Sequence, residues 1–174
     1  MNGFPETRRG LGAEVQVETA PILVLGLGNL LLRDDGVGPA VLEQLANGSS
    51  GWPNEVEFID GGTQGLALLG QLADRRAVII VDAMQTGAPA GTVHRLTLPE
   101  VRGMSAGRAS SGHEGNAGEL LAAAQVLGDL PDRLFVVGVE PEKIETGLGL
   151  SEAVQSAVPA ALDQVACILS QLLS

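Results

Sequence analysis

Residues 22–38 read "ILVLGLGNLLLRDDGVG". An apolar run followed by a turn with two glycines is typical of the strand, turn and helix that open a nucleotide-binding fold. Leu31, however, stands where the G-x-G-x-x-G fingerprint has its third glycine. Asp34 and Asp35 then lie at the start of the expected helix, where their negative charge repels a phosphate. The stretch predicts a doubly wound scaffold with carboxylates in place of the anion pocket.

The rest of the chain alternates apolar runs with stretches of helical period, which predicts a parallel sheet covered on both faces. We expect strands at 22–26, 55–59, 77–82 and 134–139, and helices at 38–47, 64–74, 115–127 and 151–172. Residues 91–97 alternate polar and apolar side chains, which favours an edge strand in antiparallel pairing. Pro159 is expected to kink or divide the last helix. The predicted fold class is α/β: a single-domain, three-layer sandwich with a mostly parallel, doubly wound sheet of about five strands.

Composition limits the class of protein and its partners. The 174 residues suffice for one domain, which we expect at 21–174 behind a flexible leader at 1–20. The net charge of -11 excludes nucleic acid and anionic lipid as main partners. A membrane helix needs about 20 unbroken apolar residues, which the sequence lacks. Cys167 is the sole cysteine and no signal peptide opens the chain, so we expect a cytoplasmic protein.

Three side chains are candidates for chemistry. Asp82 ends the most apolar strand, and ligands of open parallel sheets bind beyond the carboxyl ends of strands. If that strand lies beside 22–26, Asp35 and Asp82 flank one crevice. His113 stands in a Gly/Ser-rich loop, 102–118, expected to be mobile, from which its imidazole can reach the same crevice. Two carboxylates and an imidazole suit a divalent ion such as nickel or zinc.

Each candidate also has an ordinary structural explanation. Asp34 and Asp35 are favoured helix caps, Asp82 suits a turn or cap, and His113 resembles a polar surface residue. His94 is interpreted as a strand residue with a local hydrogen bond, and Cys167 as core filling. No G-x-S-x-G or H-E-x-x-H motif occurs, so the common serine hydrolase and zinc protease mechanisms are excluded.

Five stretches together resemble the maturation endopeptidases of nickel-iron hydrogenases. They are "VLGLGNLLLRDDGVG" (24–38), "FIDGGTQGLALL" (58–69), "VIIVDAM" (78–84), "SGHEGNAGELL" (111–121) and "FVVGVEPEKIETGLGLSEAV" (135–154). The resemblance covers about residues 21–172 in order. It implies a protease that removes the C-terminal extension of the hydrogenase large-subunit precursor after nickel insertion.

The resemblance also implies roles for particular residues. Asp35, Asp82 and His113 match the family's metal-recognising site, although some relatives have Glu at the position of Asp35. It implies that nickel comes with the precursor, that no organic cofactor is bound tightly, and that the enzyme works as a monomer. Either a carboxylate or the docked metal would activate water. Residues 60–65, "DGGTQG", either form a simple turn or line the substrate cleft.

Two other classes of protein remain open at this stage. A nucleotide-binding oxidoreductase of doubly wound fold would share the scaffold, but the missing third glycine argues against it. A non-catalytic nickel-binding chaperone would share the metal, but two His and one Cys are few ligands for that role.

Overall fold

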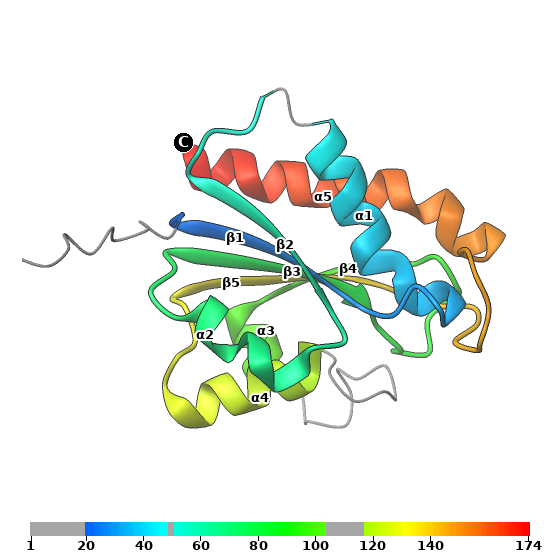
Figure 1. Cartoon of the computed structure of the whole chain (residues 1–174), viewed down its shortest axis with the longest axis horizontal. Helices are drawn as coiled ribbons and strands as arrows, with labels where there is room; N and C mark the ends of the chain where they lie inside the picture. The colour runs from blue at the N-terminus through cyan, green and yellow to red at the C-terminus, as the bar shows by residue number, and fades with distance from the viewer. Residues whose placement is uncertain (1–19, 49–50, 104–116) are drawn as a thin grey trace, which may run out of the picture.

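The computed structural model describes residues 20–48, 51–103 and 117–174. One five-stranded sheet with the order β2-β1-β3-β5-β4 forms the middle layer (Figure 1). Four strands are parallel, and β4 pairs with β5 in the antiparallel direction. The strands are β1 (Ile22–Leu27), β2 (Val56–Gly62), β3 (Ala77–Ala83), β4 (Val93–Thr97) and β5 (Arg133–Val139). The predicted α/β class is confirmed, and so are the edge position and antiparallel pairing expected for residues 91–97, which form β4.

Helices cover the sheet on both faces (Figure 1). One face carries α1 (Val37–Asn47) and α5 (Glu152–Leu173). The other carries α4 (Ala117–Leu127) together with the short elements η2 (Gly65–Leu68), α2 (Leu69–Leu72) and α3 (Leu98–Gly103). A 3-10 turn, η1 (Arg33–Gly36), joins the β1 loop to α1.

The two central strands explain why the sequence reads as unbroken apolar runs. Every residue of β1 and β3 is buried, because both faces of these strands are covered by helices. Val24 and Ile79 pack toward α1 and α5, whereas Leu25 and Ile80 pack toward α4. The core therefore consists of aliphatic side chains in two layers, consistent with an aromatic content of 2%.

The C-terminal helix is a core element. Its predicted apolar stripe, which includes Val158 and Val165, is buried against the sheet. By length and composition alone α5 would also suffice to cross a membrane, but this burial accounts for its apolar character. Pro159 lies inside the helix without dividing it, so that part of the prediction was wrong.

Other differences are local. The helix expected at 64–74 is a 3-10 turn followed by a single α-helical turn, and α3 was not predicted. Cys167 is exposed on α5, so its assignment to the core was wrong. The leader falls outside the described residues except for Ala20, and so does most of the Gly/Ser-rich loop.

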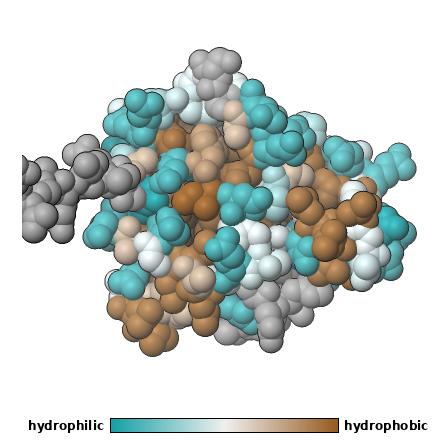
Figure 2. All heavy atoms as spheres, in the orientation of Figure 1, coloured by the Kyte–Doolittle hydropathy of each residue, from teal (hydrophilic) through white to brown (hydrophobic). Residues whose placement is uncertain are grey.

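Some large apolar side chains remain on the surface. Figure 2 shows brown patches over the end of α4 and near η1, set among polar residues. The exposed large apolar residues are Leu30, Leu31, Leu66, Val126, Leu127 and Leu148. Leu30 and Leu31 precede η1 directly, so this apolar surface borders the carboxyl end of β1.

Candidate active site

The strand order reverses at the carboxyl ends of β1 and β3. From β1 the chain crosses to β2 on one side, and it later returns to β3 on the other. Asp82 is the penultimate residue of β3, and Asp35 lies in η1, which contacts β3. The condition for the predicted juxtaposition is met, because β1 pairs directly with β3 and η1 packs against β3. The two carboxylates stand at the switch point where ligands of doubly wound proteins bind.

Two glycines allow the backbone to come this close. Gly28 has φ 128°, and a Cβ atom there would lie 1.8 Å from the carbonyl oxygen of Asp35. A Cβ on Gly38 would lie 2.1 Å from the carbonyl oxygen of Leu27. Gly38 thus allows the close helix-to-strand packing that the third glycine gives in a dinucleotide fold. In this chain α1 begins at Val37, later than the helix of the G-x-G-x-x-G fingerprint, and the turn before it, η1, contains Asp34 and Asp35.

Asp82 is buried, and two hydrogen-bond donors to it lie among the described residues. Its side chain is 3% exposed, and its two oxygens each accept one backbone N–H, from Ala83 at 2.8 Å and from Ala117 at 2.9 Å. Burial raises the pKa of Asp82 to about 7; the nearby Asp35 charge also raises it, and the two hydrogen bonds oppose the rise. A carboxyl group with this pKa exchanges protons near neutral pH, as a general acid or base must.

Asp35 faces the same crevice from the β1 side. Its side chain is 4% exposed, and its Oδ2 accepts a hydrogen bond of 2.9 Å from the backbone N–H of Asn29. The residues at the N-caps of η1 and α1 are Leu32 and Gly36, neither of which makes a side-chain capping bond. The capping explanation for Asp35 is therefore wrong.

Asp34 also does not cap a helix, although the sequence suggested it. Its fully buried carboxylate accepts hydrogen bonds from the N–H groups of Glu142 at 2.9 Å and Lys143 at 2.8 Å. It also accepts from the N–H and hydroxyl of Ser151, at 2.6 and 2.9 Å. Asp34 thus holds the β5–α5 connection, 140–151, against η1. Its role is structural, and no local pattern in the sequence indicates partners more than 100 residues away.

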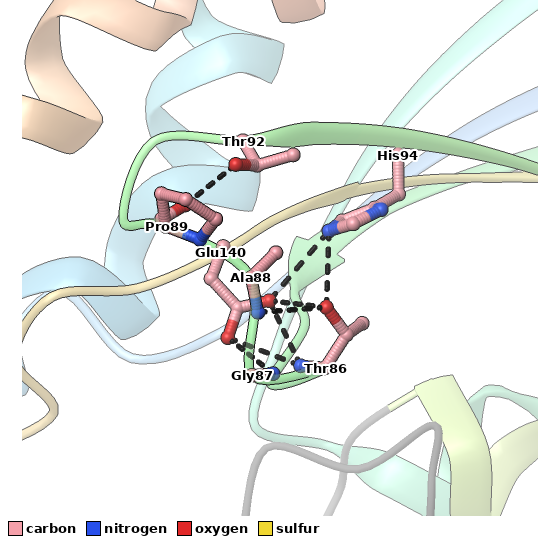
Figure 3. A network of polar contacts seen from close by, with 7 residues as sticks. All are labelled: Thr86, Gly87, Ala88, Pro89, Thr92, His94 and Glu140. Atoms are coloured by element: carbon pink, nitrogen blue, oxygen red, sulfur yellow. Dashed lines mark hydrogen bonds and ion pairs between the residues drawn. The ribbon is translucent and has the colours of Figure 1, made fainter.

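A fourth buried acid among the described residues, Glu140, was missed by sequence reasoning. Glu140 follows β5, is 5% exposed, and accepts hydrogen bonds from the hydroxyl of Thr86 at 2.7 Å and from the N–H of Gly87 at 3.0 Å (Figure 3). Burial acts to raise the pKa of Glu140, but these bonds outweigh it, and the pKa lies below its usual range. The network holds the segment after β3 in place. His94 joins it, 3.6 Å from Glu140, which confirms its predicted local role.

The "DGGTQG" segment lies next to the site. It is partly strand, because β2 runs to Gly62, so the expectation that it follows the strand was wrong for its first residues. The N–H of Gly28 donates to the carbonyl of Gly62 at 3.0 Å, which joins this segment to the turn before Asp35. Gly62 has φ 49°, so the unusual backbone angle expected here is confirmed.

His113 lies outside the described residues, so its distance from the two carboxylates stays a prediction. Within 20–48, 51–103 and 117–174, no three His, Cys, Asp or Glu side chains form a group able to hold a metal. Asp35 and Asp82 supply two oxygen ligands, and α4 begins at Ala117, four residues after His113. Of the three residues expected to recognise a metal, the described part of the chain thus contains Asp35 and Asp82.

The fold and the carboxylate pair define a doubly wound α/β protein with an acidic centre at its switch point. The family model described as hydrogenase maturation protease matches residues 39–168. The hydrogenase 2 maturation protease of Escherichia coli K12 is 38% identical over 152 residues, covering 86% of this chain and 91% of the relative. The chain belongs to the hydrogenase maturation protease family, and it is accordingly an endopeptidase.

Solved structures support the same conclusion. The hydrogenase maturating endopeptidase HybD from Escherichia coli superimposes with a TM-score of 0.76 at 36% identity, over 86% of this chain and 92% of that one. A hydrogenase 2 maturation peptidase from a Thaumarchaeota archaeon gives a TM-score of 0.65 at 36% identity, over 85% and 97%. Membership of a protease family argues against the oxidoreductase and chaperone alternatives.

Proposed function

We propose that this protein removes the C-terminal extension of a nickel-iron hydrogenase large-subunit precursor after nickel has been inserted. The observation that supports it is the buried pair of Asp35 and Asp82, in which burial and like charge raise the pKa of Asp82 to about 7. Two buried carboxylates close together lower the free energy of unfolding. Their position at the switch point, where this fold binds its ligands, therefore points to a functional role.

Nickel enters this proposal as part of the substrate. Carboxylate oxygens from Asp35 and Asp82, with the imidazole of His113, would complete the coordination of a nickel ion already held by the precursor. A precursor without nickel would lack this contact, so cleavage would report that loading is complete. No tightly bound organic cofactor is part of the proposal.

Hydrolysis has two possible routes in this site. In one, Asp82 accepts a proton from the attacking water, which a pKa near 7 suits. In the other, the nickel of the precursor polarises the water or the scissile carbonyl. In either route the metal of the precursor would position the bond that is cut.

The surroundings of the pair suggest how the precursor is selected. The "DGGTQG" segment is joined to the Gly28 turn beside Asp35, and we propose that it lines the substrate cleft. We further propose that the enzyme acts as a monomer in the cytoplasm, with the precursor as its partner and without contact to nucleic acid or membrane. The net charge of -11 is consistent with the last two points.

The proposal is tested by incubating the protein with nickel-loaded and with nickel-free precursor of its cognate hydrogenase. Mass spectrometry of the products should show loss of the extension from the loaded precursor alone. Equal cleavage of both forms would contradict nickel recognition. Absence of cleavage across all large-subunit precursors of the organism would contradict the processing function.

A further inference from the structure

Two cavities lie on α4, next to the backbone that binds Asp82. The deeper one has a volume of about 290 Å³ and is bordered by Ala117, whose N–H donates to Asp82, and by Met84, two residues after it. The second is wider, about 650 Å³, and is bordered by residues 63–66 of the "DGGTQG" segment and its continuation. Ala122 lines both cavities and therefore lies between them on the exposed side of α4. We call the two cavities, with Ala122 between them, the α4 groove.

The deeper cavity is apolar. It lies on the face of the sheet that carries Asp82, because Val136 and Leu121 of the same core layer border it. Its remaining apolar lining comes from Met84, Leu96, Val101 and three small residues of α4, Ala117, Gly118 and Ala122. The polar groups at its border are Arg102 and Gln125, both of which are exposed. An apolar side chain would gain free energy by leaving water for this cavity.

The size of the deeper cavity indicates its occupant. Small-molecule sites usually enclose roughly 300–1,000 Å³, so about 290 Å³ suits one or two side chains better than a whole nucleotide cofactor. The guanidinium of Arg102 provides donors at the border, where the carbonyl groups of an extended peptide would lie. The wider cavity continues the groove to Leu66, whose side chain is 56% exposed.

We propose that the α4 groove binds the precursor segment around the scissile bond, and that the deeper cavity takes an apolar side chain of that segment. This inference rests on the proposed function, since it assigns the groove to the same precursor. It makes Ala122 a determinant of specificity: its small side chain keeps the groove open between the "DGGTQG" segment and Met84. The hydrolytic pair then lies one hydrogen bond from the groove, through the N–H of Ala117.

The test is to fill the groove from a surface position. Ala122→Phe places a ring at the border that the two cavities share, at an exposed position of α4 where folding does not depend on the side chain. Ala160→Phe is the matched control, because Ala160 is exposed on α5, on the opposite face of the sheet. Both substitutions carry the same loss of helix propensity.

Cleavage of the nickel-loaded precursor is followed for the wild type and both variants. We expect Ala122→Phe to raise KM about 10-fold or more with kcat nearly unchanged, as loss of a side-chain pocket does, and Ala160→Phe to match the wild type. A precursor in which glycine replaces each large apolar residue of the segment around the cut should be a poor substrate for the wild type. Ala122→Phe should discriminate less between the two precursors.

The outcomes separate the two claims. Equal kcat/KM for Ala122→Phe and the wild type, in an experiment where the wild type cuts, would contradict the groove and leave the proposed function standing. Failure of the wild type to cut the precursor would contradict the proposed function, and the groove assignment with it.

Discussion

Asp34 and Asp82 are both buried aspartates at the same end of the sheet, yet their surroundings are opposite. Asp34 accepts four hydrogen bonds from the β5–α5 connection, so its charge is well compensated. Asp82 accepts two, lies near the Asp35 carboxylate, and has its pKa raised to about 7. A buried carboxylate with many hydrogen-bond donors stabilises the fold. A buried carboxylate with few donors has a shifted pKa and is available to exchange protons or bind a ligand. We therefore propose that Asp34 has a structural role, while its neighbour Asp35 belongs with Asp82 to the functional site.

The largest difference between Asp82 and Asp34 should appear in the rate of precursor cleavage. Asp82→Asn keeps the shape of the side chain but removes its charge and its ability to accept a proton, so we expect cleavage to fall about 100-fold or more. The free energy of unfolding at pH 8 should change by less than about 1 kcal/mol, because one lost hydrogen bond is offset by removal of a buried charge. Cleavage assays and urea unfolding measure the two effects; full activity would exclude Asp82 from the mechanism.

Asp34→Asn should mainly reduce stability, whereas Asp82→Asn should mainly reduce activity. The amide has one acceptor oxygen, and its NH2 group would face N–H donors that now bind a carboxylate. We expect the free energy of unfolding to fall by about 3 kcal/mol, as when hydrogen bonds to a charged buried group are lost. A change below about 1 kcal/mol in urea unfolding would show that the β5–α5 connection does not depend on this residue.

The two residues should also differ in how stability depends on pH. Asp82 has a folded-state pKa of about 7, against an ordinary value of 3.8, so the folded state binds its proton more tightly than the unfolded state. Its contribution to stability is complete below about pH 4 and is lost as the pH rises through about 7. The difference in melting temperature between wild type and Asp82→Asn should therefore change across this window.

Asp35→Asn provides the control for this titration. Removing the Asp35 charge should lower the pKa of Asp82 and move the loss of stability to lower pH. A pH profile of the difference that is flat from pH 4 to 7 would contradict the assigned pKa of Asp82.

The smallest effect is expected at Ser151, which both binds Asp34 and caps α5. Its hydroxyl donates to Asp34 at 2.9 Å and accepts from the N–H of Val154 at 3.4 Å. Ser151→Ala should reduce the free energy of unfolding by about 1–2 kcal/mol, the usual cost of a lost cap and one hydrogen bond. Thermal unfolding measures it, and Ser170→Ala on the exposed surface of α5 is a matched control.

Sequence patterns predicted the sheet and the Asp35–Asp82 pair because these depend on local signals. Continuous apolar runs mark buried parallel strands, and the carboxyl end of such a strand has a known place in the fold. Asp34 and Glu140 were not assigned correctly because their roles come from contacts 108 and 54 residues away. The missing third glycine argued against a nucleotide site, in agreement with the protease family, while Gly38 performs the packing role of that glycine from within α1.

The most direct test of this division of roles is kcat/KM for the nickel-loaded precursor, measured for Asp82→Asn and Ser151→Ala under conditions where both are folded. The account predicts a loss of about 100-fold or more for Asp82→Asn and a value within about threefold of the wild type for Ser151→Ala. The reverse order, with Asp82→Asn active and Ser151→Ala inactive, would contradict it.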